Sequence, residues 1–144
     1  MRIDKSFDAF EIGERFVSRA RTITEADLVM FAAFTGDWYP LHTDAEYVKQ
    51  TPFKQRIAHG MLVLSVATGL ARLEPGWVVA FYGMDRVRFV NPTFIGDTIH
   101  VEAEVVEKED KGAKGGVVTF RQEVKKQTGD VVASAVMKVL VAKG

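Results

Sequence analysis

The spacing of apolar residues divides the chain into an opening strand, a helical middle and a final series of strands. Residues 1–14 show no clear period and predict an irregular lead-in. Between residues 14 and 23 apolar and polar side chains loosely alternate, which predicts a first strand. A helix follows, with Thr24 as its N-cap, acidic residues in its first turn and Gly36 as its stop. A second, short helix is expected to begin at Thr43.

The helix that begins near Ala58 differs from the others because nearly every residue from Met61 to Leu73 is apolar. A helix that is apolar on almost all sides must be surrounded by other parts of the protein. About fourteen residues would span about 21 Å, which is about the reach of a sheet that could wrap around the helix. We therefore expect a long, buried central helix, ended by Glu74-Pro75-Gly76.

The second half of the chain predicts antiparallel strands. Residues 77–90 form either two strands or one long strand bent near Gly83. Residues 98–108 alternate apolar and polar side chains, which is typical of a strand with one buried face. Two more strands are expected at 117–125 and 131–141. This order of elements predicts an α+β fold with the helices on one side of the sheet.

Length, composition and charge favour one globular domain over residues 1–144. The 19 basic residues balance the 19 acidic residues, so no overall field attracts nucleic acid, although a local basic patch would suffice for an anionic small molecule. The absence of cysteine excludes disulfides and thiolate nucleophiles and suits a reducing compartment. No signal peptide is recognisable, and no apolar segment reaches the ~20 residues that span a bilayer. We expect a cytoplasmic protein that does not associate with membranes.

Two stretches concentrate the residues that can carry chemistry. The stretch 35–42 contains Asp37 and His42, a carboxylate and an imidazole that can move protons. The stretch 58–62 places Gly60 at the start of the apolar helix, where an unpaired backbone N–H at the positive end of the helix dipole can stabilise an anion. Because a residue before proline avoids helical backbone, Asp37 and His42 are expected on a loop between two helices. We expect the two stretches to form one active site.

The sequences of these stretches resemble the motifs of a known family. Residues 35–42 read Thr-Gly-Asp-Trp-Tyr-Pro-Leu-His, residues 59–61 read His-Gly-Met, and residues 96–98 read Gly-Asp-Thr after the phenylalanine-containing stretch 89–93. They are similar to the signatures of the MaoC-like dehydratase, or (R)-specific enoyl-CoA hydratase, family. One difference is that Tyr39 stands where that family usually has asparagine. The resemblance implies the hot-dog fold, in which a curved antiparallel sheet wraps around a long central helix.

The resemblance also implies an activity. Enzymes of this family add water to the double bond of a 2-enoyl-CoA thioester, or remove it from the 3-hydroxyacyl-CoA, without a cofactor or a metal. By analogy, Asp37 and His42 would hold one water and share the proton transfers, while the Gly60 N–H would bind the enolate oxygen. The resemblance further implies a homodimer or a higher homo-oligomer, with the sheets joined edge to edge and CoA near the interface.

Five further residues are candidates for substrate binding. Trp38, Tyr39 and Phe53 are expected to line an acyl pocket, although buried aromatic residues more often belong to a core. Thr68 stands where the family often has a hydroxyl near the catalytic pair, but a hydrogen bond to a helix carbonyl explains it equally well. His59 is either a second acid or, the interpretation we favour, a residue whose hydrogen bond fixes the loop before the helix.

Charged residues near these stretches suggest two other kinds of site. Lys54, Arg56, Arg86 and Arg88 are candidates for binding the phosphates of CoA, although such residues usually lie on the surface without a ligand. Asp37, His42, Asp44 and His59 carry atoms suited to metal ligation, but their spacing matches no familiar metal motif. We therefore expect no metal.

Two alternative functions remain compatible with the sequence. A hot-dog acyl-CoA thioesterase would use Asp37 to direct water at the thioester carbonyl, and release of free thiol from a saturated ester would reveal it. A non-catalytic acyl-thioester-binding module is conceivable because Tyr39 replaces the usual asparagine, and it would bind CoA esters without turnover. The presence of both Asp37 and His42 favours the hydratase.

Overall fold

One long antiparallel sheet dominates the computed structural model, which describes all 144 residues. The sheet has the order β2-β6-β7-β8-β5, and β3 also pairs with β6. Its strands are β2 (Arg15–Val17), β3 (Arg21–Thr22), β5 (Val78–Phe89), β6 (Thr98–Asp110), β7 (Gly116–Lys126) and β8 (Val131–Val141). A separate parallel pair joins β1 (Arg2–Ile3) to β4 (Arg72–Leu73).

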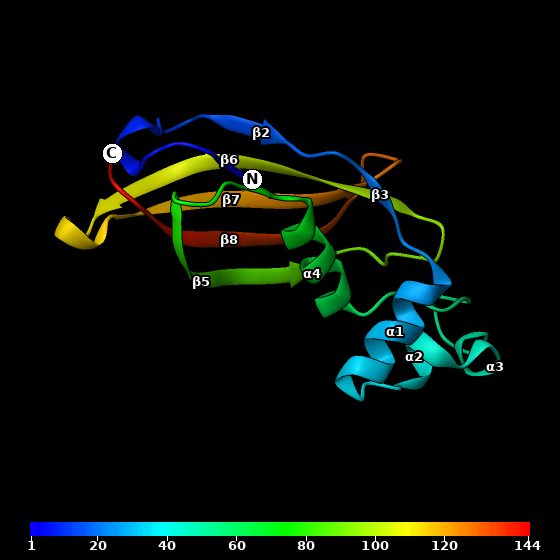
Figure 1. The fold of residues 1–144 in the computed structure, drawn as a ribbon. Coiled ribbons are helices and arrows are strands. Elements are labelled where there is room, and N and C mark those ends of the chain that lie inside the picture. Colours follow the sequence, from blue (N-terminus) through cyan, green and yellow to red (C-terminus); the bar gives the residue numbers. More distant parts are fainter.

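The helices lie on one side of this sheet and toward one end of it (Figure 1). They are α1 (Glu25–Thr35), α2 (Pro40–Thr43), α3 (Ala45–Val48) and α4 (Gly60–Leu70), with two short 3-10 turns at Phe7–Ala9 and Gly112–Lys114. In Figure 1, α4 lies against the sheet while α1, α2 and α3 form a group beside its end. The α+β plan expected from the sequence is confirmed. No helix has the length and hydropathy that crossing a membrane requires.

The start of α1 follows the sequence closely. The Thr24 hydroxyl accepts a hydrogen bond from the Asp27 N–H, and the Asp27 carboxylate accepts one from the Thr24 N–H, so two amides of the first turn are satisfied reciprocally. Gly36 ends the helix with a φ of 78°, a backbone conformation that glycine adopts without strain. Both predicted ends of this helix are confirmed. They fix where the chain leaves α1 toward Asp37.

The inner face of the sheet is built by the alternation seen in the sequence. Ile99, Val101 and Val105 on β6 are almost completely buried, while His100 and Glu102 between them point to the outer face. The region 77–90 forms one long strand rather than two, with irregular pairing at three places, one of them between Phe81 and Gly83. Bulges of this kind bend a strand without breaking it.

The core has two parts because α4 is much shorter than the strands beneath it. Eleven residues rise about 16 Å in a helix but extend about 37 Å in a strand such as β7. The first part of the core packs α4 against the sheet. The second part is closed by the first ten residues of the chain, including Phe7 and Phe10, which are 6% and 2% exposed. The irregular lead-in is confirmed apart from a two-residue strand and one 3-10 turn, but its packing against the sheet was not predicted.

The central helix is also shorter and less enclosed than expected. It ends at Leu70 because Arg72 and Leu73 leave the helix and pair with the first strand. One side of α4 is open, and Met61 on that side is 60% exposed. The prediction of a helix extending to Leu73 and surrounded on all sides was wrong for the single chain.

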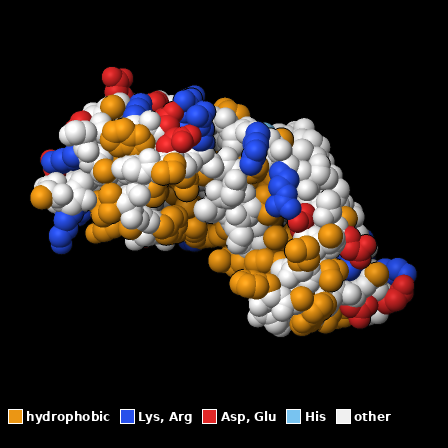
Figure 2. All heavy atoms as spheres, in the orientation of Figure 1, with side chains coloured by type: hydrophobic (Ala, Val, Ile, Leu, Met, Phe, Trp, Pro, Cys, Tyr) orange, Lys and Arg blue, Asp and Glu red, His pale blue; other side chains and the backbone are white.

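Apolar side chains also remain exposed on the edge strand β5. Val79, Phe81 and Tyr82 are each more than half exposed, and β5 has a strand neighbour on one side only. Hydrophobic side chains gather over this edge and extend toward the helical end of the molecule (Figure 2). Contiguous apolar surface of this kind is typical of a surface that another chain covers.

Candidate active site

Asp37 lies in the short loop between α1 and α2, as expected. Its N–H donates to the Thr35 hydroxyl at 3.2 Å, and its Oδ1 accepts the Tyr39 N–H at 3.2 Å. These two bonds hold the loop while the second carboxylate oxygen bonds no group of the protein. The side chain is exposed and has an oxygen available to a ligand or a water.

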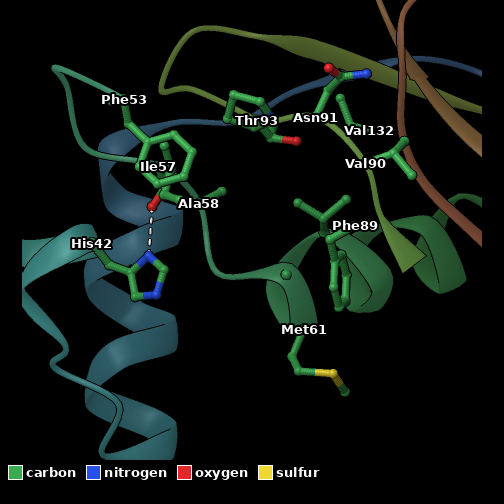
Figure 3. Close-up of a pocket in the computed structure, with 13 residues that line it drawn as sticks. His42, Phe53, Ile57, Ala58, Met61, Phe89, Val90, Asn91, Thr93 and Val132 are labelled. Carbon is green, nitrogen blue, oxygen red and sulfur yellow. Dashed lines mark hydrogen bonds between the residues drawn. The ribbon is translucent and has the colours of Figure 1, made fainter. Parts of the chain in front are cut away.

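His42 lies in the short helix α2 and not in the loop, so that part of the prediction was wrong. Pro40 is compatible with a helix because it occupies the first position, where its missing N–H would have had no partner. The Nδ1 atom of His42 is 2.7 Å from the Ile57 carbonyl oxygen (Figure 3). Since a carbonyl only accepts, Nδ1 carries the proton and Nε2 is left with a free lone pair in the neutral ring.

His59 lies directly beneath His42. The two rings stack with centroids 3.8 Å apart and planes 27° apart, and the Phe31 ring lies 4.9 Å from His59. His59 Nε2 is 3.0 Å from the Asp37 carbonyl oxygen, so one hydrogen bond links the start of α4 to the Asp37 loop. The side chain is 2% exposed, and burial lowers its pKa. The structure thus shows a hydrogen bond of the structural kind that we favoured for this residue.

Gly60 is the first residue of α4, and its N–H donates no hydrogen bond within the chain. The site requires glycine for steric reasons, because a Cβ here would come within 2.7 Å of the Phe89 ring. An unpaired N–H at a helix start can bind an anionic oxygen. Gly60 therefore supplies the anion-stabilising group that Asp37 and His42 lack.

A cavity of about 350 Å³ opens beside these groups. His42 and Phe53 lie on one side of it, and Phe89, Val90 and Val132 lie on the other (Figure 3), while Gly60 lines it next to the Phe89 ring. Most of its lining is apolar, which is typical of pockets that hold small organic ligands. The arrangement places a free imidazole nitrogen and an unpaired N–H at the wall of an apolar cavity.

The structure brings some of the other candidate residues to the cavity and leaves others outside it. Phe53 lines the cavity, whereas Trp38 and Tyr39 are half-exposed and do not. Tyr39 instead contacts the edge of the His42 ring, with centroids 6.4 Å apart. Thr68 is exposed on α4 and donates to the Leu64 carbonyl, the structural alternative considered for it.

The wall formed by residues 89–93 was not assigned from the sequence. Phe89, Val90 and Thr93 line the cavity, together with Val132 from the neighbouring strand. The stretch 89–93 is part of the motif that resembles the family, and this was the available signal. Nothing local indicates Val132, because its place depends on the pairing of β5 with β8.

The four cationic candidates differ in their partners. Arg56 forms an ion pair with Glu25, whereas Lys54, Arg86 and Arg88 have no carboxylate partner. Lys54 and Arg86 also adopt positive φ angles of 64° and 52°, which few residues other than glycine adopt. The three unpaired side chains remain available to an anionic ligand.

The side-chain atoms of three of the candidates lie close together. Ligand atoms of Asp37, His42 and His59 lie within 4.8 Å of one another, whereas the Asp44 carboxylate is engaged in capping α3. A water that makes two hydrogen bonds of normal length joins atoms about 4.6 Å apart. Asp37 and His42 therefore lie within a distance that one shared water can bridge.

Comparison with known proteins assigns the chain to a family. The model of the MaoC-like domain family matches residues 8–128. The chain belongs to the MaoC-like family. A protein named MaoC from Klebsiella aerogenes is 39% identical over 100 residues, which are 67% of this chain and 29% of that protein. An (R)-specific enoyl-CoA hydratase from Aeromonas caviae is 33% identical over 108 residues, covering 74% of this chain and 79% of that protein. The MaoC-like chain thus spans well under half of the first relative and most of the second.

Solved structures support the fold of this MaoC-like chain. A monoamine oxidase regulatory protein from Archaeoglobus has a TM-score of 0.92 and 45% identity, covering 100% of this chain and 97% of that one. A Mycobacterium tuberculosis protein described as a double hot-dog fold has a TM-score of 0.85 and 22% identity, covering 97% of this chain and 44% of that one. The MaoC-like chain has the hot-dog fold that the sequence predicted.

Proposed function

We propose that this MaoC-like protein is a hydratase/dehydratase that interconverts 2-enoyl-CoA and (R)-3-hydroxyacyl-CoA thioesters. The observation that carries the proposal is that His42 and the unpaired N–H of Gly60 line one apolar cavity, while a carboxylate oxygen of Asp37 lies within 4.8 Å of a His42 ring nitrogen. Relatives named (R)-specific enoyl-CoA hydratase and 3-hydroxybutyryl-CoA dehydratase support the same reaction class.

Hydration requires three tasks, and the site has one group suited to each. A base must take a proton from water as its oxygen attacks the β-carbon. A donor must hold the negative charge that moves to the thioester oxygen, and an acid must return a proton to the α-carbon. Asp37 and His42 together hold the water and exchange the protons, and the Gly60 N–H binds the enolate oxygen. Dehydration uses the same groups in the reverse order.

The expected size of each contribution follows from general enzymology. A positioned acid–base pair contributes about 10²–10⁴-fold in rate. One oxyanion donor contributes about 10²–10³-fold, or about 3–4 kcal/mol. This chemistry needs no cofactor and no metal, since Asp37 and His42 handle the proton transfers and the Gly60 N–H stabilises the negative charge on the enolate oxygen.

The proposal includes a homodimer. The free edge of β5, its exposed Phe81 and Tyr82, and the open side of α4 all lie uncovered in one chain. An uncovered strand edge beside apolar side chains is a liability unless another chain pairs with it. A second copy that pairs along β5 would cover this edge. The cations Arg86 and Arg88 on β5 would then lie near the interface, where they could meet the phosphates of CoA.

Two assays on the purified protein test the reaction class. Loss of enoyl-thioester absorbance with crotonyl-CoA, and formation of the (R)-3-hydroxy product, would support the hydratase. Release of free thiol from butyryl-CoA without hydration of crotonyl-CoA would show a thioesterase instead. Binding of both esters without any turnover would show an acyl-thioester-binding module.

A further inference from the structure

His59 contacts every part of the proposed active site, although it does not line the cavity. It donates through Nε2 to the main chain of Asp37, and its ring stacks on the ring of His42. It also directly precedes Gly60 in the chain and is the N-cap residue of α4. A side chain with these three connections can fix the relative positions of the base, the acid and the anion-binding N–H.

The hydrogen bonds of His59 define its protonation state. The Asp37 carbonyl can only accept, so the proton of the neutral ring is on Nε2. The other nitrogen, Nδ1, is buried and has no hydrogen-bond partner. A second proton on Nδ1 would create a buried N–H without an acceptor, which costs free energy. The ring is therefore neutral.

The groups around His59 strengthen this conclusion. The titratable groups that face it are His42 and Asp37, and the Phe31 ring on α1 is uncharged. When His42 takes a proton during the reaction, a second positive ring 3.8 Å away would oppose it. A neutral His59 gives His42 a flat aromatic surface to stack on without adding a positive charge that would oppose protonation of His42.

We propose that His59 is a positioning residue that stays neutral, orients the His42 ring by stacking and anchors the Asp37 loop through its Nε2–H. This inference rests on the proposed function. It also argues against the role of second acid considered from the sequence, because the buried Nδ1 carries no proton and His59 does not line the cavity.

The first test uses nitrogen NMR of the imidazole rings and needs no substrate. The chain has only three histidines, so His42, His59 and His100 are assigned by comparison with single variants. We expect His59 to keep its proton on Nε2 alone from about pH 8 to about pH 6, and neutral His42 to carry its proton on Nδ1. A doubly protonated His59 in this range, or a proton on its Nδ1, would overturn the proposal.

The second test separates the two contacts of His59 by substitution. His59→Phe keeps a flat ring against His42 but loses the N–H, His59→Gln keeps a donor but loses the ring, and His59→Leu loses both. We expect kcat to fall about 10-fold in the first two variants and about 100-fold in the third, with KM changed less than about twofold. His100→Gln, on the outer face of the sheet, is the matched control and is expected to behave like wild type.

The outcomes distinguish this inference from the function on which it rests. Wild-type kcat in all three His59 variants would overturn the positioning role. A raised KM at unchanged kcat would also overturn it and would indicate contact with substrate. Absence of enoyl-CoA hydration by the wild-type protein would refute the proposed function, while the NMR result would still decide the protonation state of His59.

Discussion

Replacement of Gly60 by alanine is the sharpest steric perturbation that the site offers. The new Cβ would lie 2.7, 2.8 and 2.9 Å from three carbons of the Phe89 ring. Favourable carbon–carbon contacts lie at about 3.5–4.0 Å, so the separation must grow by about 1 Å. Either the first turn of α4 shifts or the Phe89 ring, which is half-exposed, turns away into the cavity.

The expected cost follows from what moves. A shift of the first turn misdirects the Gly60 N–H, and loss of one oxyanion donor lowers kcat by about 10²-fold or more. Movement of the Phe89 ring into the cavity would instead reduce substrate binding. We expect kcat of Gly60→Ala to fall about 10²-fold because the backbone of the helix start carries the reactive N–H.

Steady-state hydration of crotonyl-CoA measures this effect. Gly69→Ala is the matched control, since it lies on the same helix, has no atom within 4 Å of its added Cβ and should leave kcat unchanged. The Phe89→Ala variant completes a double-mutant cycle, in which removal of the ring should restore part of the rate lost by Gly60→Ala. Wild-type kcat in Gly60→Ala, or an equal loss in Gly69→Ala, would refute the assignment of the N–H.

Three further predictions concern stability and assembly. Thr24→Ala removes the cap of α1 and should lower the free energy of unfolding by about 1 kcal/mol, measured by urea denaturation; an unchanged midpoint would contradict the capping role. Burial alone would raise the pKa of Asp97, but hydrogen bonds from the Phe94 N–H, Gln127 and Lys126 lower it overall. The ionised Asp97 therefore contributes to the free energy of unfolding above its unfolded-state pKa, and this contribution is lost as the pH falls through its folded-state pKa. Asp97→Asn should therefore flatten the acid limb of the stability–pH curve, and an unaltered limb would count against this. Phe81→Asp should convert the proposed dimer into monomers in sedimentation, whereas an intact dimer would place the interface elsewhere.

The sequence predicts best where the cause of a structure is local. The cap at Thr24 and the stop at Gly36 involve residues within a few positions of each other, and both are confirmed. The strand 98–108 is confirmed because alternation reports directly which face is buried. The ends of α1 in turn place Asp37 in its loop.

The failures involve partners far apart in the chain. The lead-in has no period because it is neither helix nor long strand, and it is buried by contacts with distant strands. Phe7, for example, packs where Gly116 has no side chain, and a Cβ at Gly116 would lie 2.3 Å from the Phe7 ring. No local pattern around Phe7 could show this.

The candidate site shows the same division. The motif brought Asp37, His42 and Gly60 to attention, but the free nitrogen of His42 is defined by the carbonyl of Ile57, fifteen positions away. The stack of His42 on His59 spans a similar separation. Residue types indicated the chemistry, whereas the protonation states required the three-dimensional structure.

The measurement that tests the central claim most directly is the rate of crotonyl-CoA hydration by the wild type, Asp37→Asn and His42→Gln, with His100→Gln as the control. The account predicts rapid loss of enoyl absorbance in the wild type and the control, and a fall of at least about 10²-fold in each of the other two variants. Hydration that is indifferent to both substitutions would contradict the assignment of Asp37 and His42 as the acid–base pair.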